Sequence, residues 1–465
     1  MIRLLALAGY VYQSLLAIAL IFAISHLLPT ADYTNFSLAL ASSQLLCVLM
    51  FEWLQLAGLR FLAAAEPAEA ARLRASLFAA GGLSAVALVA VGSGASLIGT
   101  LASEVIVVGL AIAVLQGVTD LYFLTIRLSG GLGMASSLMA LRASAVLGGA
   151  VIGALVAGTA RATLLGVAAG HAAGLLVGLI AHRAPLRIVS FRAMLGHWAE
   201  FCRYGMLAAG ASVTHLSVPV LLRFIVIHRL GATDAGAGFS VALDLLQRPF
   251  WVLNAAIHTV SYPDVVRDFE HGGELTARQT TGRMFDFMIC TTIVLLGGLI
   301  GFIPDAARIL LPWASQDGFL ATAPMVALFY FLHTHLQATA AVVPHLEKLA
   351  IRLVVVAAGQ LASVVAMSAI ASRLGLSPVG AVTCAAAATA LTLLLALSPT
   401  VRFRAILRWR LAIAAAAAGM LIGSLAVVPS AQPAWLASKV VFAGIVTALV
   451  AWRGDFLMLA QHDRG

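Results

Sequence analysis

Long apolar stretches separated by short polar connectors run along the whole chain of 465 residues. Each stretch has about the 20 residues that an α-helix needs to cross a bilayer. Backbone N–H and C=O groups have no water to bond in lipid, so these stretches must be helical. The pattern predicts an all-α, polytopic membrane protein with about fourteen transmembrane helices, at residues 4–28, 34–58, 76–99, 104–126, 137–158, 163–182, 204–228, 237–261, 284–303, 322–343, 350–371, 378–398, 410–428 and 435–452.

Basic residues divide unequally between alternate connectors. If the N-terminus is cytoplasmic, the cytoplasmic connectors contain 21 of the 28 lysines and arginines and the outer connectors contain five. Cytoplasmic loops of membrane proteins carry such an excess. We therefore predict a multi-pass protein of the bacterial inner (plasma) membrane with both termini cytoplasmic. The longest cytoplasmic connectors, 183–203 and 264–283, are expected to form amphipathic helices along the membrane, and the longest outer connector is 304–321.

A short motif occurs twice, about 203 residues apart. His26, Asp32 and a Phe-Ser-Leu-Ala-Leu run follow the first stretch, and His228, Asp234 and a Phe-Ser-Val-Ala-Leu run follow the seventh. Two repeated six-helix lobes with two appended helices form a transporter-like plan. The repeat predicts an N-terminal lobe at 1–182, a cytoplasmic connector at 183–203, a C-terminal lobe at 204–398, and two additional transmembrane helices with a short cytoplasmic tail at 399–465.

Composition supports this class and excludes others. Hydrophobic residues make up 62% of the chain and charged residues 10%, whereas soluble domains carry about 25% charged residues. The formal charge of +9 would suggest nucleic acid in a soluble protein, but here the basic residues lie between apolar runs and face lipid headgroups. We expect membrane lipid as a partner and no nucleic acid. The four cysteines are far apart and show no metal-binding spacing.

Arg223 lies inside the seventh apolar stretch, with no carboxylate at helical spacing within that segment. Arginine stays charged at any accessible pH, so another helix, water or an anionic ligand must solvate it. His215 lies eight residues earlier, roughly on the same helix face. A cavity-lining, anion-binding arginine is the preferred interpretation, with a buried ion pair or headgroup snorkelling as alternatives.

The eighth stretch is unusually polar. Asp244 and Arg248 are four residues apart and can neutralise each other, while Arg248, Asn254 and His258 are further candidates for lining a wet cavity. Ionisable side chains at membrane depth usually face a partner or water. Four carboxylates are therefore candidates for coupling to a proton or a cation, although each also suits a structural role: Glu52, Asp120, Asp244 and Asp286.

Other features favour packing or exclude chemistry. Gly166, Gly170, Gly174 and Gly178 recur every four residues and predict a groove for close helix approach. His333 and His335 point about 200° apart on a helix, which argues against a shared metal site. The sequence has no G-x-x-x-x-G-K-[ST], H-E-x-x-H or G-x-S-x-G motif. We expect no catalytic residues, no metal and no cofactor.

The stretch 203–263 resembles a known family. Arg203-Tyr-Gly-Met-Leu opens a helix that ends in His228-Arg-Leu-Gly-Ala, followed by Ala235-Gly-Ala-Gly-Phe-Ser and Ser261-Tyr-Pro-Asp. This order is similar to the polysaccharide transporter family, the oligosaccharide flippases of the multidrug/oligosaccharidyl-lipid/polysaccharide exporter superfamily. Members often carry an acidic residue near the middle of the seventh helix, where this chain has Val218-Pro-Val.

The resemblance implies two lobes that rock around a central cavity and move an undecaprenyl-diphosphate-linked oligosaccharide to the outer leaflet, with polysaccharide-assembly proteins as partners. Arg223 would suit the cationic cavity that the resemblance implies. The alternatives are a multidrug and toxin extrusion antiporter of the same superfamily, a membrane-embedded polysaccharide polymerase with catalytic residues in a larger outer loop, and a non-transporting scaffold. A transporter, and not an enzyme, is the preferred hypothesis.

Overall fold

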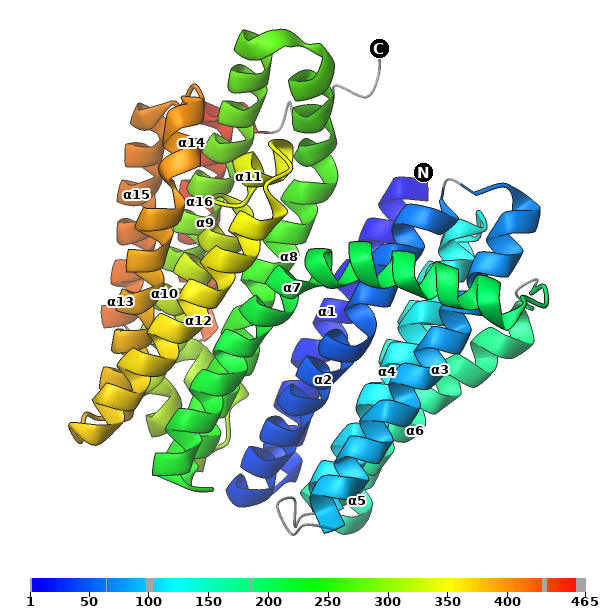
Figure 1. The fold of residues 1–465 in the computed structure, drawn as a ribbon. Helices are drawn as coiled ribbons and strands as arrows, with labels where there is room; N and C mark the ends of the chain where they lie inside the picture. Colours follow the sequence, from blue (N-terminus) through cyan, green and yellow to red (C-terminus); the bar gives the residue numbers. More distant parts are fainter. Residues whose placement is uncertain (1, 64, 98–103, 184–185, 429–432, 457–465) are drawn as a thin grey trace. The chain divides into compact units, whose positions relative to one another are not determined.

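The computed structural model describes residues 2–63, 65–97, 104–183, 186–428 and 433–456, and within them the side chains other than those of 2–10, 93–97, 104–106, 208, 256 and 258–260. The chain forms two compact units, Met1–Thr233 and Asp234–Gly465. The helices of unit 1 are α1 (Ile2–Leu27), α2 (Thr30–Leu62), α3 (Pro67–Leu97), α4 (Glu104–Leu128), α5 (Leu132–Ala157), α6 (Ala160–Ala181) and α7 (Phe191–Leu230) (Figure 1).

Unit 2 is helical as well. Its helices are α8 (Asp234–His271), α9 (Gly273–Leu310), α10 (Trp313–Ala338), α11 (Val342–Leu346), α12 (Ala350–Arg373), α13 (Pro378–Ala396), α14 (Ser398–Phe403), α15 (Trp409–Gly423), the 3-10 helix η1 (Ser424–Val427) and α16 (Pro433–Arg453).

The predicted all-α, polytopic fold is confirmed. Within the described residues, twelve helices are long and apolar enough to cross a membrane, and α1 contributes a shorter apolar stretch at Val11–Leu27. Helix α8, with 38 residues, is the fourteenth long helix. Trp435 and Trp452 lie near the two ends of α16 and are mostly exposed. Their separation of 17 residues corresponds to about 26 Å of helix, and tryptophan is enriched at both bilayer surfaces.

The glycines of α6 form the predicted packing groove. A Cβ at Gly170 would come within 2.5 Å of the Val146 backbone on α5, and one at Gly174 within 2.8 Å of the Arg142 Cβ. A Cβ at Gly166 would overlap the backbone of Gly149 on α5. These two helices can therefore approach backbone to backbone, which is the role that small residues play between membrane helices.

Helix α7 includes the second half of the connector predicted at 183–203. Figure 1 shows its first part lying across other helices of unit 1 before the helix turns to run beside α2. Trp198 donates from Nε1 to the Ser76 carbonyl of α3 at 2.9 Å, and Phe201 packs on Phe61 of α2. Helix α7, which sequence analysis assigns to the C-terminal lobe, thus packs within unit 1. The transport lobes and their boundaries remain predictions.

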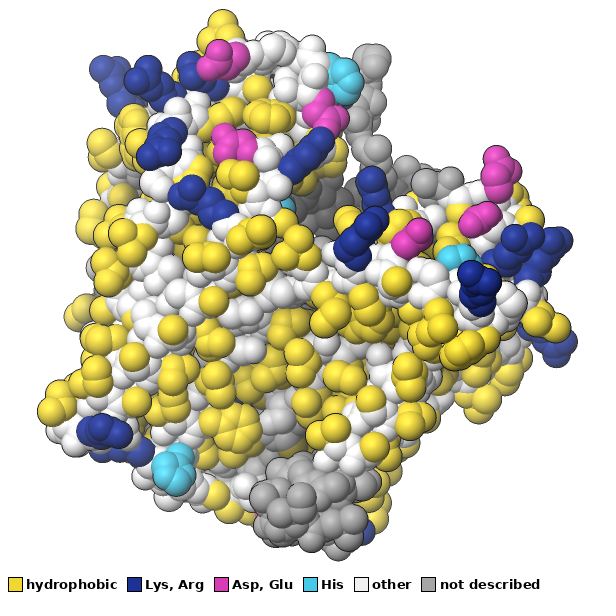
Figure 2. Space-filling model, viewed as in Figure 1, with side chains coloured by type: hydrophobic (Ala, Val, Ile, Leu, Met, Phe, Trp, Pro, Cys, Tyr) yellow, Lys and Arg dark blue, Asp and Glu magenta, His cyan; other side chains and the backbone are white. Residues whose placement is uncertain are grey.

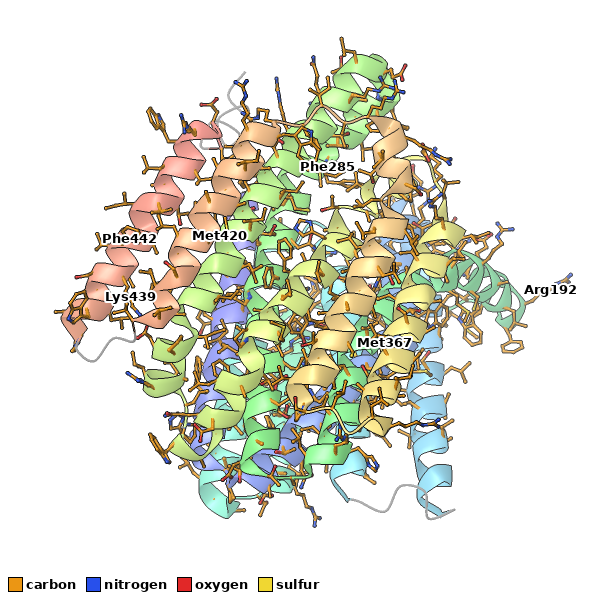
Figure 3. All side chains as sticks on the ribbon, turned by 90° about the vertical axis from the view of Figure 1, so that its left-hand side faces the viewer. Arg192, Phe285, Met367, Met420, Lys439 and Phe442 are labelled. Carbon is orange, nitrogen blue, oxygen red and sulfur yellow. The ribbon has the colours of Figure 1, made fainter. Side chains whose placement is uncertain are left out.

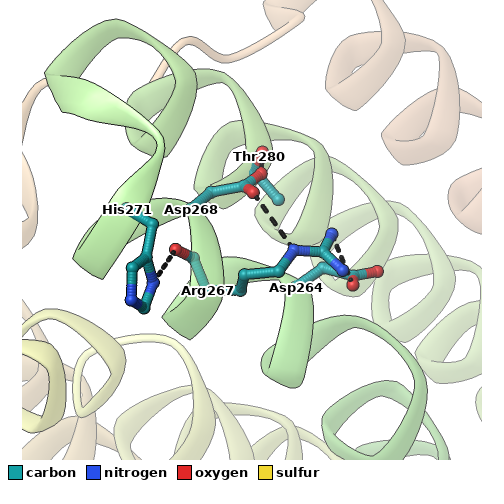
Figure 4. Close-up of polar contacts among 5 residues, drawn as sticks. All are labelled: Asp264, Arg267, Asp268, His271 and Thr280. Atoms are coloured by element: carbon teal, nitrogen blue, oxygen red, sulfur yellow. Dashed lines mark hydrogen bonds and ion pairs between the residues drawn. The ribbon is translucent and has the colours of Figure 1, made fainter.

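The connector predicted at 264–283 as a helix along the membrane has a different structure. Helix α8 continues to His271 and α9 starts at Gly273, so the segment forms the tip of a helical hairpin. Arg267 pairs with Asp264 at 3.0 Å, and Thr280 donates to Asp268 at 2.5 Å across the hairpin (Figure 4). The polar residues bond to one another along and between the two helices, which explains why the segment extends past the apolar spans.

The outer connector predicted at 304–321 is also shorter than expected. Helix α9 extends to Leu310 despite Pro304, and α10 begins at Trp313, so Leu311 and Pro312 alone join them. The predicted ninth helix, 284–303, ends too early because hydropathy alone assigns Asp305 to a loop. The segment offers no larger loop that could hold the catalytic residues of a polymerase.

Three basic residues counted as connector residues are buried in helices, namely Arg74 of α3, Arg142 and Lys439. Arg142 lies ten residues inside α5, and Lys439 lies inside α16. Removing Arg74 and Arg142 from the cytoplasmic count and Lys439 from the outer count changes the predicted split from 21-to-5 to 19-to-4. Figure 2 shows that, in each unit, most visible lysine and arginine side chains gather toward the helix ends that carry the predicted cytoplasmic connectors.

Candidate functional site

Arg223 is buried against α2 in unit 1, with 5% of its surface exposed. Its Nη1 atom donates to the Ser37 carbonyl at 3.0 Å and to the Ser37 Oγ at 2.6 Å. His215, two turns earlier on α7, is buried as well. Arg223 is seven residues from the end of α7, or about 10 Å. The arginine is therefore near the C-terminal end of its helix, and its side chain bonds to a neighbouring helix instead of extending into solvent.

Three residues of the repeated motif lie at buried or bonded positions. Asp32 of α2 accepts a hydrogen bond from the Ala160 backbone N–H at 2.9 Å and so connects α2 to the start of α6. Ser37 and its counterpart Ser240 of α8 are both buried. In the first copy, Ser37 accepts a hydrogen bond from the Arg223 guanidinium. This contact links the repeated motif to the candidate cavity residue.

A second charged cluster lies in unit 1 between α2, α4, α5 and α6. Arg142 forms an ion pair with Asp120, and its guanidinium lies 5.5 Å from the centre of the Phe123 ring. Glu52 interacts electrostatically with Asp120, and the buried His171 with Arg142. Ser37 and Glu52 are 15 residues apart on α2, about 22 Å along its axis. The carboxylate cluster and the Arg223 contact are therefore at different depths.

The candidate residues of α8 follow one another along half-buried positions. Asp244, Arg248 and Asn254 are each partly exposed, and the His258 side chain lies outside the described ones. Asp244 and Arg248 both have interactions with other groups of the protein. Their mutual pairing stays a prediction.

Asp286 has a structural partner that sequence analysis missed. Its carboxylate accepts from the Arg408 backbone N–H at 3.0 Å and from Arg408 Nε at 2.9 Å. Arg408 also donates from Nη2 to the Gly454 carbonyl at 3.0 Å. Asp286 of α9 thus holds the residues where α15 begins and α16 ends. No local sequence pattern indicates this pair, since 122 residues separate the two side chains.

The same helix holds a second buried pair about five turns further on. Lys439 Nζ of α16 donates to Asp305 Oδ2 of α9 at 2.7 Å, and both side chains are at most 4% exposed. Gly297 and Gly301 of α9 lie between these carboxylates, where an added Cβ would meet the backbone of α15. Helix α9 therefore binds the two last helices through ion pairs at two levels and close packing between them.

The histidines of α10 have separate sets of partners. His333 bonds to Gln337 at 2.9 Å and to Gln360 of α12 at 2.8 Å, whereas His335 bonds to Thr292 at 2.9 Å and to Thr339 at 2.8 Å. The two rings thus do not share a site, as the helical spacing predicted. Sequence analysis did not single out Gln360, although a fully buried glutamine in an apolar helix is itself a polar-network signal.

These clusters give each unit a polar interior, with different chemistry. Unit 1 contains a guanidinium held by Ser37 and a carboxylate pair near Arg142, groups suited to an anion and to a cation or proton respectively. The polar network of α10 and α12 in unit 2 is uncharged apart from its titratable histidines. Such groups are costly in lipid, so each cluster needs partners within the protein or contact with water.

The chain is similar to known proteins in its fold but not in its sequence. No protein-family model matches the sequence, and no curated protein matches it.

The fold is shared with solved transporters. A structure of the lipid II flippase MurJ in an inward closed conformation matches with a TM-score of 0.69 at 10% identity, over 98% of this chain and 99% of that one. An inward-facing multidrug resistance MATE family transporter of the MOP superfamily matches with a TM-score of 0.63 at 14% identity, over 84% and 94% of the two chains.

A third match is a MOP superfamily transporter from Pyrococcus furiosus, described as having a binding pocket of reverse polarity that suggests a different function. Its TM-score is 0.55 at 14% identity, over 86% of this chain and 94% of that one. The chain therefore has the fold of these solved transporters, as the family resemblance implies.

Proposed function

We propose that this protein is a flippase that moves a lipid-diphosphate-linked oligosaccharide across the bacterial inner membrane by alternating access. The single observation that carries the proposal is the extent of the fold likeness. The match to the lipid II flippase covers 98% of the chain, and the remaining 2% of 465 residues is only about 9. The match therefore includes most of α15 and α16, and the likeness extends beyond the two repeated six-helix sets.

Arg223 is proposed to meet the diphosphate of the substrate. A diphosphate that crosses a low-dielectric layer needs a cation that cannot lose its proton, and arginine has that property. Its planar group can bond two phosphate oxygens at once. In the described arrangement Nη1 bonds to Ser37, so substrate binding would replace or share this contact. His215, Arg248, Asn254 and His258 remain proposed cavity residues.

Glu52, Asp120, Asp244 and Asp286 were the candidates for ion coupling. Glu52 interacts electrostatically with Asp120 in the interior of unit 1, and Asp120 also pairs with Arg142, so Glu52 beside this pair is the carboxylate that we propose for a proton or cation. Asp286 is engaged by two donors of Arg408, which supports a structural role for it.

The test uses the full-length protein in vesicles that contain a fluorescent undecaprenyl-diphosphate oligosaccharide. We expect the labelled lipid to move between the two leaflets faster than in protein-free vesicles. An impermeant quencher, which reaches only the outer leaflet, measures this movement. The runner-up function, a MATE-type antiporter, is favoured by the MATE matches. It predicts instead that a cationic dye is transported against a proton or sodium gradient while the lipid stays in its leaflet. That result would reject the flippase.

Arg223 is tested in the same assay. We expect Arg223→Gln to insert normally and flip almost no lipid, and Arg223→Lys to insert and flip slowly because ammonium cannot copy the bidentate contact. If Arg223 only ties α7 to α2, Ser37→Ala and Arg223→Gln should both reduce the amount of inserted protein. The exposed Arg373→Gln serves as the matched control. Normal flipping by well-inserted Arg223→Gln would remove Arg223 from the substrate path.

A further inference from the structure

A cavity lies where α15 begins and α16 ends, at the predicted cytoplasmic surface of unit 2. Its volume is about 730 Å³, and its lining consists of Leu407, Arg408, Trp409, Arg410, Leu411, Ala414 and Arg453. Figure 3 shows α15 and α16 side by side, with Met420 and Phe442 labelled on them. The cavity thus opens at one end of two adjacent membrane-spanning helices.

The charge of this cavity is positive. Three of its seven lining residues are arginines. Asp286 engages the Arg408 Nε, and the Gly454 carbonyl engages Nη2. This orients Arg408 but leaves it 44% exposed. Within the described residues, no hydrogen bond or ion pair engages the side chains of Arg410 and Arg453. Asp286 is the carboxylate bonded at this cavity, and Asp455 follows Arg453 at an exposed position.

The other four lining residues of the cavity are Leu407, Trp409, Leu411 and Ala414. Leu411 and Ala414 continue this lining along α15 toward the bilayer centre, and Ile413 and Ile445 are exposed on the lipid-facing sides of α15 and α16. Trp409, at the level of the arginines, is 65% exposed, as expected of an aromatic side chain at the headgroup level. A molecule with an anionic head and hydrocarbon tails matches this order of arginine, tryptophan and aliphatic residues.

We propose that this cavity binds the phosphate of an anionic phospholipid, with Arg410 and Arg453 on the phosphate and the acyl chains along α15 and α16. Basic pockets between helices on the cytoplasmic side bind such headgroups in other membrane proteins. The proposal does not depend on the proposed substrate. A bound lipid would join the start of α15 to the end of α16, next to the Asp286–Arg408 pair.

The experiment measures lipid retained by the purified full-length protein by native mass spectrometry, after exposure to equal amounts of phosphatidylglycerol and phosphatidylcholine. We expect preferential retention of phosphatidylglycerol. In the double variant Arg410→Gln/Arg453→Gln, the ratio of retained phosphatidylglycerol to phosphatidylcholine should fall about 25-fold. Each basic residue near an anionic group raises the affinity for it about fivefold. Arg408 is left intact because it holds Asp286. The single variants should each lose about fivefold.

The matched control is Arg187→Gln/Arg192→Gln, which removes two exposed arginines of unit 1; Arg192 projects outward in Figure 3. This control should retain phosphatidylglycerol as the wild type does. Three outcomes would overturn the proposal: equal retention of both lipids, an equal loss in the control, or displacement of the lipid by millimolar inorganic phosphate, which would indicate a site for free anions. If the double variant does not purify as a monodisperse protein, unchanged retention by both single variants overturns it.

Discussion

Several buried charges in this protein form ion pairs with residues far away in the sequence, and both side chains of the Lys439–Asp305 pair are at most 4% exposed. Removing one partner of a buried pair leaves an uncompensated charge, which costs about 3–5 kcal/mol. Replacing both partners avoids that cost. Asp286 with Arg408 and Asp120 with Arg142 follow the same rule at other depths.

We therefore expect Lys439→Met to lower the thermal unfolding temperature of the purified protein and its amount in the membrane. The double variant Asp305→Asn/Lys439→Met should recover most of the loss. Lys348, the other lysine of the chain, is exposed, so Lys348→Met should change neither quantity. The pair would have no structural role if the double variant were as unstable as the sum of the two single variants.

Sequence analysis could name such residues but could not pair them. Asp120, Asp286 and Arg223 were recognised as costly because a charge in an apolar stretch is visible in one dimension. Their partners Arg142, Arg408 and Ser37 are 22, 122 and 186 residues away, and no local spacing encodes those distances. Asp305 and Lys439 were missed because both lie near the ends of apolar stretches, where hydropathy takes a charge as a loop residue.

At the scale of helices, periodicity was more informative than hydropathy. The four-residue repeat of glycines predicted the face of α6 that packs closely, and the structure confirms it. Hydropathy misplaced the ends of α8, α9 and α10, because polar residues such as Asp264 and Thr280 can continue a helix once a neighbouring helix satisfies them. Where a helix extends beyond the lipid, the partners of its polar side chains determine where it ends. The mean hydropathy of a segment does not detect such partners.

The α5–α6 contact gives a test at this scale. A Cβ at Gly170 would press on the Val146 backbone, whereas one at Gly148 of α5 would meet nothing within 4 Å. We expect Gly170→Ala to destabilise the protein by about 1–3 kcal/mol, because overpacking forces backbones apart. Gly148→Ala should be neutral or stabilising by up to about 1 kcal/mol, since alanine favours the helix. Thermal unfolding in detergent measures both. Equal stability of the two variants would contradict the close packing.

At the scale of the whole molecule, the number of helices and the position of basic residues imply one orientation. An even number of crossings, such as the fourteen that the sequence predicts, would return the chain to its starting side. The connector charges stay asymmetric when Arg74, Arg142 and Lys439 are counted as helix residues. Within each unit, the connectors with few basic residues are short turns, such as 231–233 and Leu311–Pro312. The connectors on the opposite side include the basic segments before α7 and α15. Translocation of short loops is disfavoured by basic residues, so the polar, arginine-rich ends should face the cytoplasm.

Single cysteines at the two kinds of connector test this orientation. Thr233→Cys lies in the turn after α7, Trp313→Cys begins α10 at a position 87% exposed, and His271→Cys lies at the exposed tip of the α8–α9 hairpin. An impermeant maleimide added to intact cells should label the first two and should reach His271→Cys only after the membrane is opened. The native cysteines are buried or half-buried, so the wild type gives the background. Labelling of His271→Cys in intact cells would show that the predicted topology is inverted. The cavity of Arg410 and Arg453 would then lie in the outer leaflet.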